Sequence, residues 1–102
     1  MIPIAALSPP DASATAAALA LLAEEGSVCV PWGGGCRQEM GYLPGRYDLA
    51  LSTANLTRLV DLQPGDLTVT VEAGMTLAQL QSLLAEHGQF VALESPQPER
   101  ET

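Results

Sequence analysis

Small and apolar residues predict a helix near the start of the chain. Asp11 follows two prolines, and its side chain is of a type that caps helix N-termini. The apolar residues after it recur at helical spacing and share one face: Ala12, Ala16, Leu19, Leu22 and Ala23. Gly26 can adopt the left-handed conformation that ends many helices. The pattern predicts a helix over 12–25 that packs on a sheet.

Short apolar runs predict the strands of that sheet. Residues 28–30 form a buried run that leads directly into three glycines, and residues 48–52 form another. Residues 59–62 and 67–73 are expected to pair, because Pro64-Gly65 between them suits the centre of a type II turn. Alternate residues of the second strand are expected to face one way: Leu67, Val69, Val71 and Ala73.

A second helix is predicted over 76–87. Thr76 and Gln79 have the spacing of a capping box, and Gly88 is expected just past the helix end. One helical face carries most of the apolar side chains: Leu77, Leu80, Leu84 and, at its end, His87. Residues 89–93 are expected to return as a strand. The element order predicts an α+β fold, a small sheet with two packed helices.

Composition excludes several function classes. Apolar residues make up 47% of the 102, which is enough for one modest core. The net charge is −8, so the chain lacks a basic patch that would bind nucleic acid or an anionic membrane. Lysine is absent, which excludes a nucleotide-binding P-loop, because that loop needs its lysine. Cys29 and Cys36 are expected to be ordinary thiols rather than metal ligands. No segment resembles a targeting or membrane-spanning sequence, and we expect a cytoplasmic protein.

The glycine run is the main candidate for chemistry. Gly33-Gly34-Gly35 directly follows a predicted strand, and residues without side chains let the backbone approach a ligand. Successive N–H groups in such a turn form a nest for an anion, of which a pyrophosphate is the natural example. A simple connecting turn explains the run equally well. The usual dinucleotide-binding fingerprint is absent, because Gln38 occupies its third glycine position.

Several motifs resemble the PCMH-type flavin domain of the vanillyl-alcohol-oxidase family of FAD-linked oxidases. Residues 30–35 with Gly41 are similar to the first phosphate loop of that family, and residues 49–56 to the strand after it. Residues 64–74 and 76–81 match most closely, and residues 88–96 resemble the segment leading to the flavin ring. Within the family, the FAD-binding subunit of glycolate oxidase is most similar.

The resemblance implies the first subdomain of a PCMH-type FAD-binding fold, with FAD as the cofactor. It implies cofactor-binding roles for Pro31, Trp32, Gly33, Gly34, Gly35, Cys36, Arg37, Gly41 and Pro96. Cys36 departs from the family, which usually has a small polar residue there, so a hydroxyl contact with phosphate is in doubt. Arg37 and Arg46 either pair with a phosphate or are exposed charges.

The resemblance also implies a function. The complete enzyme would oxidise a small 2-hydroxy acid such as glycolate by hydride transfer to the flavin. Residues 1–102 would supply the first half of the flavin domain, without the second half or a substrate domain, and would be inactive alone. Other oxidase subunits are further partners that the resemblance implies. No residue is a candidate catalytic acid or base; His87, Glu72 and Glu94 are interpreted as structural or solvated. The alternative is a small non-catalytic binding module that reuses this piece of the fold.

Overall fold

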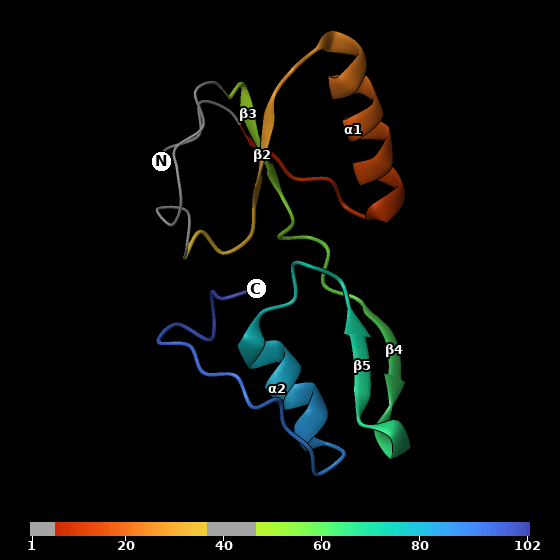
Figure 1. The fold of residues 1–102 in the computed structure, drawn as a ribbon, viewed down its shortest axis with the longest axis vertical. Coiled ribbons are helices and arrows are strands. Elements are labelled where there is room, and N and C mark those ends of the chain that lie inside the picture. The colour runs from red at the N-terminus through yellow and green to blue at the C-terminus, as the bar shows by residue number, and fades with distance from the viewer. Residues whose placement is uncertain (1–5, 37–46) are drawn as a thin grey trace.

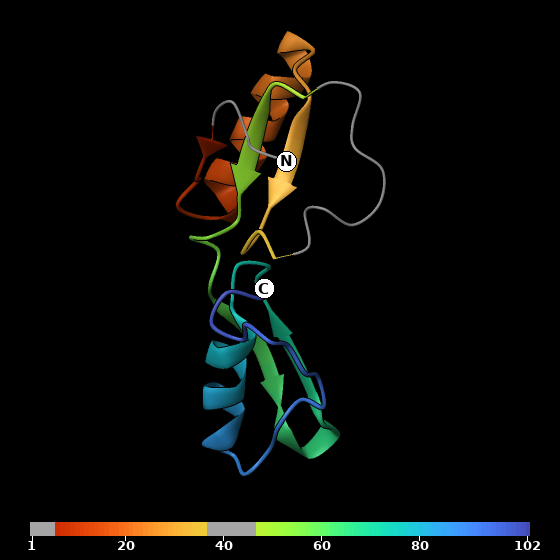
Figure 2. The same cartoon turned by 90° about the vertical axis from the view of Figure 1, so that its left-hand side faces the viewer.

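The chain forms two sheets, each with its own helix. The computed structural model describes residues 6–36 and 47–102. In the first part, α1 (Ala12–Glu25) lies alongside a three-stranded sheet, and in the second, α2 (Leu77–Ala85) lies alongside a two-stranded one (Figures 1 and 2). The α+β class is confirmed. The strands form two sheets, whereas the sequence pattern predicted one small sheet with two packed helices.

The first sheet is entirely parallel. Its strands, in spatial order, are β1 (Ala6–Leu7), β3 (Leu49–Ser52) and β2 (Cys29–Trp32). The central strand β3 contains two buried residues, Ala50, which is 2% exposed, and Leu51, which is 7% exposed. Strands 28–30 and 48–52 were predicted from sequence, whereas the two-residue β1 is too short to give a pattern.

The helix α1 has the predicted ends but a different buried face. Asp11 accepts a hydrogen bond from the N–H of Ala14 at 2.8 Å, and Gly26 has φ 68°. Ala18 and Leu22 are covered, whereas Leu19 is 43% exposed. Alanines surround the whole circumference of this helix, so its apolar pattern does not specify which side meets the sheet.

The second sheet is an antiparallel hairpin with a different turn from the one predicted. Its strands are β4 (Leu59–Gln63) and β5 (Thr68–Val71). A 3-10 turn over Pro64–Asp66 joins them, and the residue with positive φ is Leu67 (57°) rather than Gly65. A type II turn is therefore wrong. Leu67, which was expected to share a face with Val69 and Val71, precedes β5 in the left-handed conformation and is 81% exposed.

The helix α2 begins at the predicted capping box and ends at Ala85, two residues before the predicted end. Both bonds of the capping box form: the Thr76 hydroxyl accepts from the Gln79 N–H at 3.2 Å, and the Gln79 side chain accepts from the Thr76 N–H at 2.9 Å. At the other end Gly88 has φ 67°, and Gln89 donates to the carbonyl of Leu84, which gives a Schellman motif. Leu84 is buried, whereas His87 is exposed.

The predicted strand over 89–93 is absent from the described residues. This segment runs beside α2 and pairs with no strand; the side chain of Gln81 bonds to Val91 instead. Phe90 and Leu93 remain exposed.

The chain exposes more surface than a compact protein of its size. Its accessible surface is 6841 Å², against about 5,500 Å² expected for a compact monomer of this mass. Several large apolar side chains contribute, among them Leu21, Val60, Leu67, Phe90 and Leu93. The described residues therefore contain only a small core.

Candidate functional site

The glycine run lies where two parallel strands end together. Trp32 at the end of β2 pairs with Ser52 at the end of β3, and the next residue, Thr53, donates its N–H to the Trp32 carbonyl at 3.0 Å. Gly33 to Gly35 leave the sheet at this point. In parallel sheets, the carboxyl ends of the strands are where ligands bind.

One residue of the run needs to be glycine for its own conformation. Gly35 has φ 76°, a left-handed value that L side chains rarely adopt. A Cβ atom there would also lie 2.9 Å from the indole nitrogen of Trp32. The indole of Trp32 thus lies against the backbone of the loop.

The other two glycines contact the end of the chain. A Cβ atom on Gly33 would collide with the hydroxyl of Thr102, and one on Gly34 with the main-chain carbonyl of Arg100. The absence of side chains therefore lets residues 97–102, which we call the tail, approach the loop backbone directly. Figure 2 shows this tail between the end of β2 and the start of α2.

Side-chain bonds reinforce this contact. The guanidinium of Arg100 donates through Nη2 to the Gly34 carbonyl and through Nη1 to Oε1 of Gln97, both at 2.9 Å. The thiol of Cys36 lies 3.8 Å from the same Gln97 oxygen. The loop and the tail, more than 60 residues apart in sequence, are joined at both Gly34 and Cys36.

The tail also occupies the N-terminus of α2. Leu77 donates to the carbonyl of Glu101 at 2.7 Å, and Ala78 donates to that of Pro98 at 2.8 Å. Gln79 donates to the capping hydroxyl of Thr76. Because these first-turn N–H groups have partners within the chain, the end of this helix is not a free anion site.

A cavity of about 280 Å³ opens between the glycine loop and the start of α2. Its lining includes two glycines of the loop, three threonines, one arginine and one glutamate: Gly33, Gly34, Ala54, Thr57, Gly74, Thr76, Gln79, Glu99, Arg100 and Thr102. Backbone N–H groups, hydroxyls and a guanidinium are donors that suit phosphate oxygens. Complete small-molecule pockets occupy about 300–1,000 Å³, so the space suits a diphosphate rather than a whole dinucleotide.

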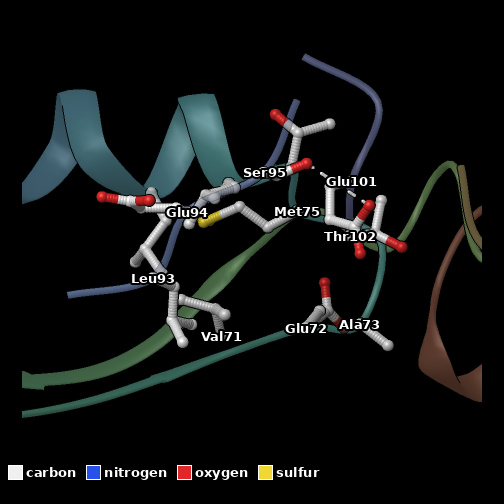
Figure 3. A pocket seen from close by; sticks show the side chains of 12 residues that line it. Val71, Glu72, Ala73, Met75, Leu93, Glu94, Ser95, Glu101 and Thr102 are labelled. Carbon is white, nitrogen blue, oxygen red and sulfur yellow. Dashed lines mark hydrogen bonds between the residues drawn. The ribbon is translucent and has the colours of Figure 1, made fainter. Parts of the chain in front are cut away.

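A second cavity, of about 340 Å³, differs in that its lining includes no cationic side chain (Figure 3). Val71, Met75 and Leu93 line it together with the carboxylates of Glu72 and Glu101, and the dashed line marks the bond of Glu101 to Ser95. Its carbon walls and carboxylates disfavour an anion. The Glu72 carboxylate accepts the N–H of Arg58 at 2.9 Å, consistent with the structural role expected of it.

The structure brings together some, but not all, of the site residues that were predicted from the sequence. Trp32, Gly33, Gly34, Gly35 and Cys36 form one continuous loop. Pro31 is an exposed residue of β2. Pro96 is also exposed, between Ser95, which bonds to Glu101, and Gln97, which bonds to Arg100. Arg37, Gly41 and Arg46 lie outside the described residues.

Sequence reasoning missed the residues that the tail brings to the loop. Gln97 and Arg100 have no hydrophobic periodicity around them, so no pattern pointed to them. The available signal was composition: Arg100 is one of only four cationic side chains in a strongly acidic chain.

Other candidate chemistry does not appear in the described part of the chain. Cys29 and Cys36 are both free thiols. Within residues 6–36 and 47–102, no cluster of histidine, cysteine and carboxylate side chains could hold a metal. No helix in those ranges has the length and apolar character to cross a bilayer.

Comparison with known proteins identifies the family. A family model described as FAD binding domain matches residues 3–100. The chain belongs to this FAD-binding family. FAD is therefore its cofactor, and the donor set around the glycine loop fits the diphosphate of that molecule. No curated protein sequence matches the chain significantly.

Solved structures support the fold. Two structures of alkyldihydroxyacetonephosphate synthase, in different crystal forms, superpose on 95% of the chain with TM-scores of 0.79 and 0.78, each at 15% sequence identity. The fold is thus that of the PCMH-type FAD-binding enzymes. The chain spans about a fifth of the length of these structures: 20% of one and 18% of the other.

Proposed function

We propose that the loop Gly33–Cys36 binds the pyrophosphate of FAD in an FAD-linked oxidoreductase. The observation that carries the proposal is the cavity beside Gly33 and Gly34, where loop backbone meets the Arg100 guanidinium at the carboxyl end of a parallel sheet. The strand ends bring the loop backbone to the ligand, and glycine keeps side chains out of its path.

Local charge supports the same assignment. A net charge of −8 repels a pyrophosphate at long range, so binding depends on donors close to it. Arg100 and the threonine hydroxyls supply such donors within the described residues. Pro31, Trp32, Arg37, Gly41 and Pro96 complete the proposed cofactor contacts on the strength of the family resemblance.

The chemistry of the complete enzyme would come from the flavin. Bound FAD supplies a hydride acceptor, while this chain binds and orients the cofactor. The resemblance favours a small 2-hydroxy acid such as glycolate as the substrate. The substrate site and any further oxidase subunits would lie outside these 102 residues.

The small share of the structural relatives that the chain covers supports a cofactor site shared with further residues. The chain spans a fifth of its structural relatives and exposes more surface than a compact monomer, with Phe90 and Leu93 uncovered. The rest of a flavin domain would cover such side chains and enclose the cofactor from its other side.

Substitution of Gly34 tests the proposal in the whole protein that contains this chain. Gly34→Val would place a branched side chain against the Arg100 carbonyl and push the loop and tail apart. Flavin content per purified protein should fall from near one to near zero. Gly65→Val is the matched control, since a Cβ atom at Gly65 meets nothing within 4 Å. Normal flavin content in Gly34→Val would refute the assignment.

A further inference from the structure

The side chains of Gln97 and Arg100 connect the tail to the glycine loop at two points. Arg100 bonds to the carbonyl of Gly34, and Gln97 lies against the thiol of Cys36 while also accepting from Arg100. We propose that the Gln97–Arg100 pair positions the glycine loop for diphosphate binding. This inference rests on the proposed function of the loop.

The bond to Gly34 sets the direction of the loop peptide. In a trans peptide unit, the carbonyl of one residue and the N–H of the next point in opposite directions. With the Gly34 carbonyl held by Arg100, the peptide between Gly34 and Gly35 is fixed in one orientation. A glycine run without such an anchor would rotate freely among several peptide orientations.

The shape of the arginine side chain makes it suited to this role. The guanidinium is planar and carries five N–H donors, so it can bond to Gln97 and Gly34 at once and keep donors for a ligand. Arg100 also lines the cavity beside the loop. A lysine would retain the positive charge there, but its single ammonium group could not reproduce the planar, two-pronged arrangement of donors.

The main chain holds the two side chains in register. The N–H groups of Arg100 and Glu101 donate to the Gln97 carbonyl at 2.9 and 2.8 Å, which closes a tight turn. This turn places the Gln97 amide beside the guanidinium. Gln97 is therefore a positioning residue that acts through Arg100.

Equilibrium binding to the flavin-free full-length protein tests the pair. Arg100→Gln, Arg100→Lys and Gln97→Leu are compared with Arg58→Gln, which removes the same charge as Arg100→Gln from a residue on the hairpin side of the chain. Loss of a charge-assisted hydrogen bond corresponds to about a 10- to 100-fold weaker affinity for FAD in Arg100→Gln. Gln97→Leu and Arg100→Lys should also weaken FAD binding, whereas Arg58→Gln should not.

Two further measurements separate positioning from charge. Riboflavin lacks the diphosphate, so its affinity should be the same in every variant. Hydrogen exchange of the Gly34 and Gly35 amides, measured without ligand, should be faster in Arg100→Gln and Gln97→Leu than in the unaltered protein or Arg58→Gln.

The outcomes distinguish this inference from the proposed function. An unaltered protein that binds no FAD would overturn the proposed function itself. If it binds FAD and Arg100→Lys binds equally well, charge alone suffices and the positioning role is overturned. Unchanged loop exchange in Gln97→Leu would overturn it as well.

Discussion

The side-chain amide of Gln81 makes both hydrogen bonds that a neighbouring strand would make to Val91. Its Oε1 accepts the Val91 N–H at 3.0 Å, and its Nε2 donates to the Val91 carbonyl at 2.7 Å. Both contacts are partly buried. A single side chain on α2 therefore replaces a strand as the partner of the segment after the helix.

Replacement of this amide should loosen the segment. Gln81→Leu keeps similar bulk but leaves the Val91 peptide without its partner, which should lower the free energy of unfolding by about 1–3 kcal/mol. Urea denaturation measures the change. Gln63→Leu is the control, because Gln63 is exposed and its amide bonds only to the side chain of Asp61. Equal effects of the two substitutions would contradict the role assigned to Gln81.

The left-handed Leu67 predicts a stabilising substitution. This conformation costs an L residue roughly 1–2 kcal/mol, and asparagine tolerates it better than leucine. Since Leu67 is 81% exposed, little packing is lost on replacement. Leu67→Asn should raise the free energy of unfolding by about 0.5–1 kcal/mol in thermal or urea melts.

The same leucine-to-asparagine substitution at a strand position should lower the free energy of unfolding instead of raising it. Leu59 begins β4 and is 41% exposed. Asparagine is disfavoured in strands, so Leu59→Asn should destabilise the protein. A loss of stability in Leu67→Asn would show that this leucine contributes through contacts rather than through turn strain.

Residues 1–102 alone should not retain FAD. The cavity beside the glycine loop has room for a diphosphate, while the flavin ring would have no apolar enclosure around it. The net charge of −8 also weakens the binding of the anionic cofactor. The exposed apolar side chains favour self-association of the chain. The purified chain, incubated with FAD and desalted, should show no flavin absorbance. A retained flavin band near one per chain would mean that these residues form a complete FAD module.

Features encoded within a few residues were predicted well. Asp11 caps α1, Thr76 and Gln79 form the capping box, and Gly26 and Gly88 end the two helices in the left-handed conformation. Each of these depends on hydrogen bonds between residues three to five positions apart, so the sequence specifies them directly. The hairpin turn is the local exception, because positive φ moved from Gly65 to Leu67.

Long-range partners were not predictable in the same way. The division into two sheets, the buried face of α1 and the pairing of Val91 with Gln81 depend on which surfaces meet. An alanine-rich helix and a short apolar segment are compatible with several arrangements, and packing selects one of them.

The glycine loop combines features that the local sequence specifies with contacts that form only in the folded chain. The sequence by itself determined that three glycines follow a strand and that the surrounding motifs resemble an FAD-binding domain, because both are read from consecutive residues. Only the tertiary structure decided that Gln97 and Arg100 hold the loop at Cys36 and Gly34. That contact joins residues more than 60 positions apart, and it forms only when the end of the chain folds across the start of α2, whose first N–H groups bind the tail carbonyls.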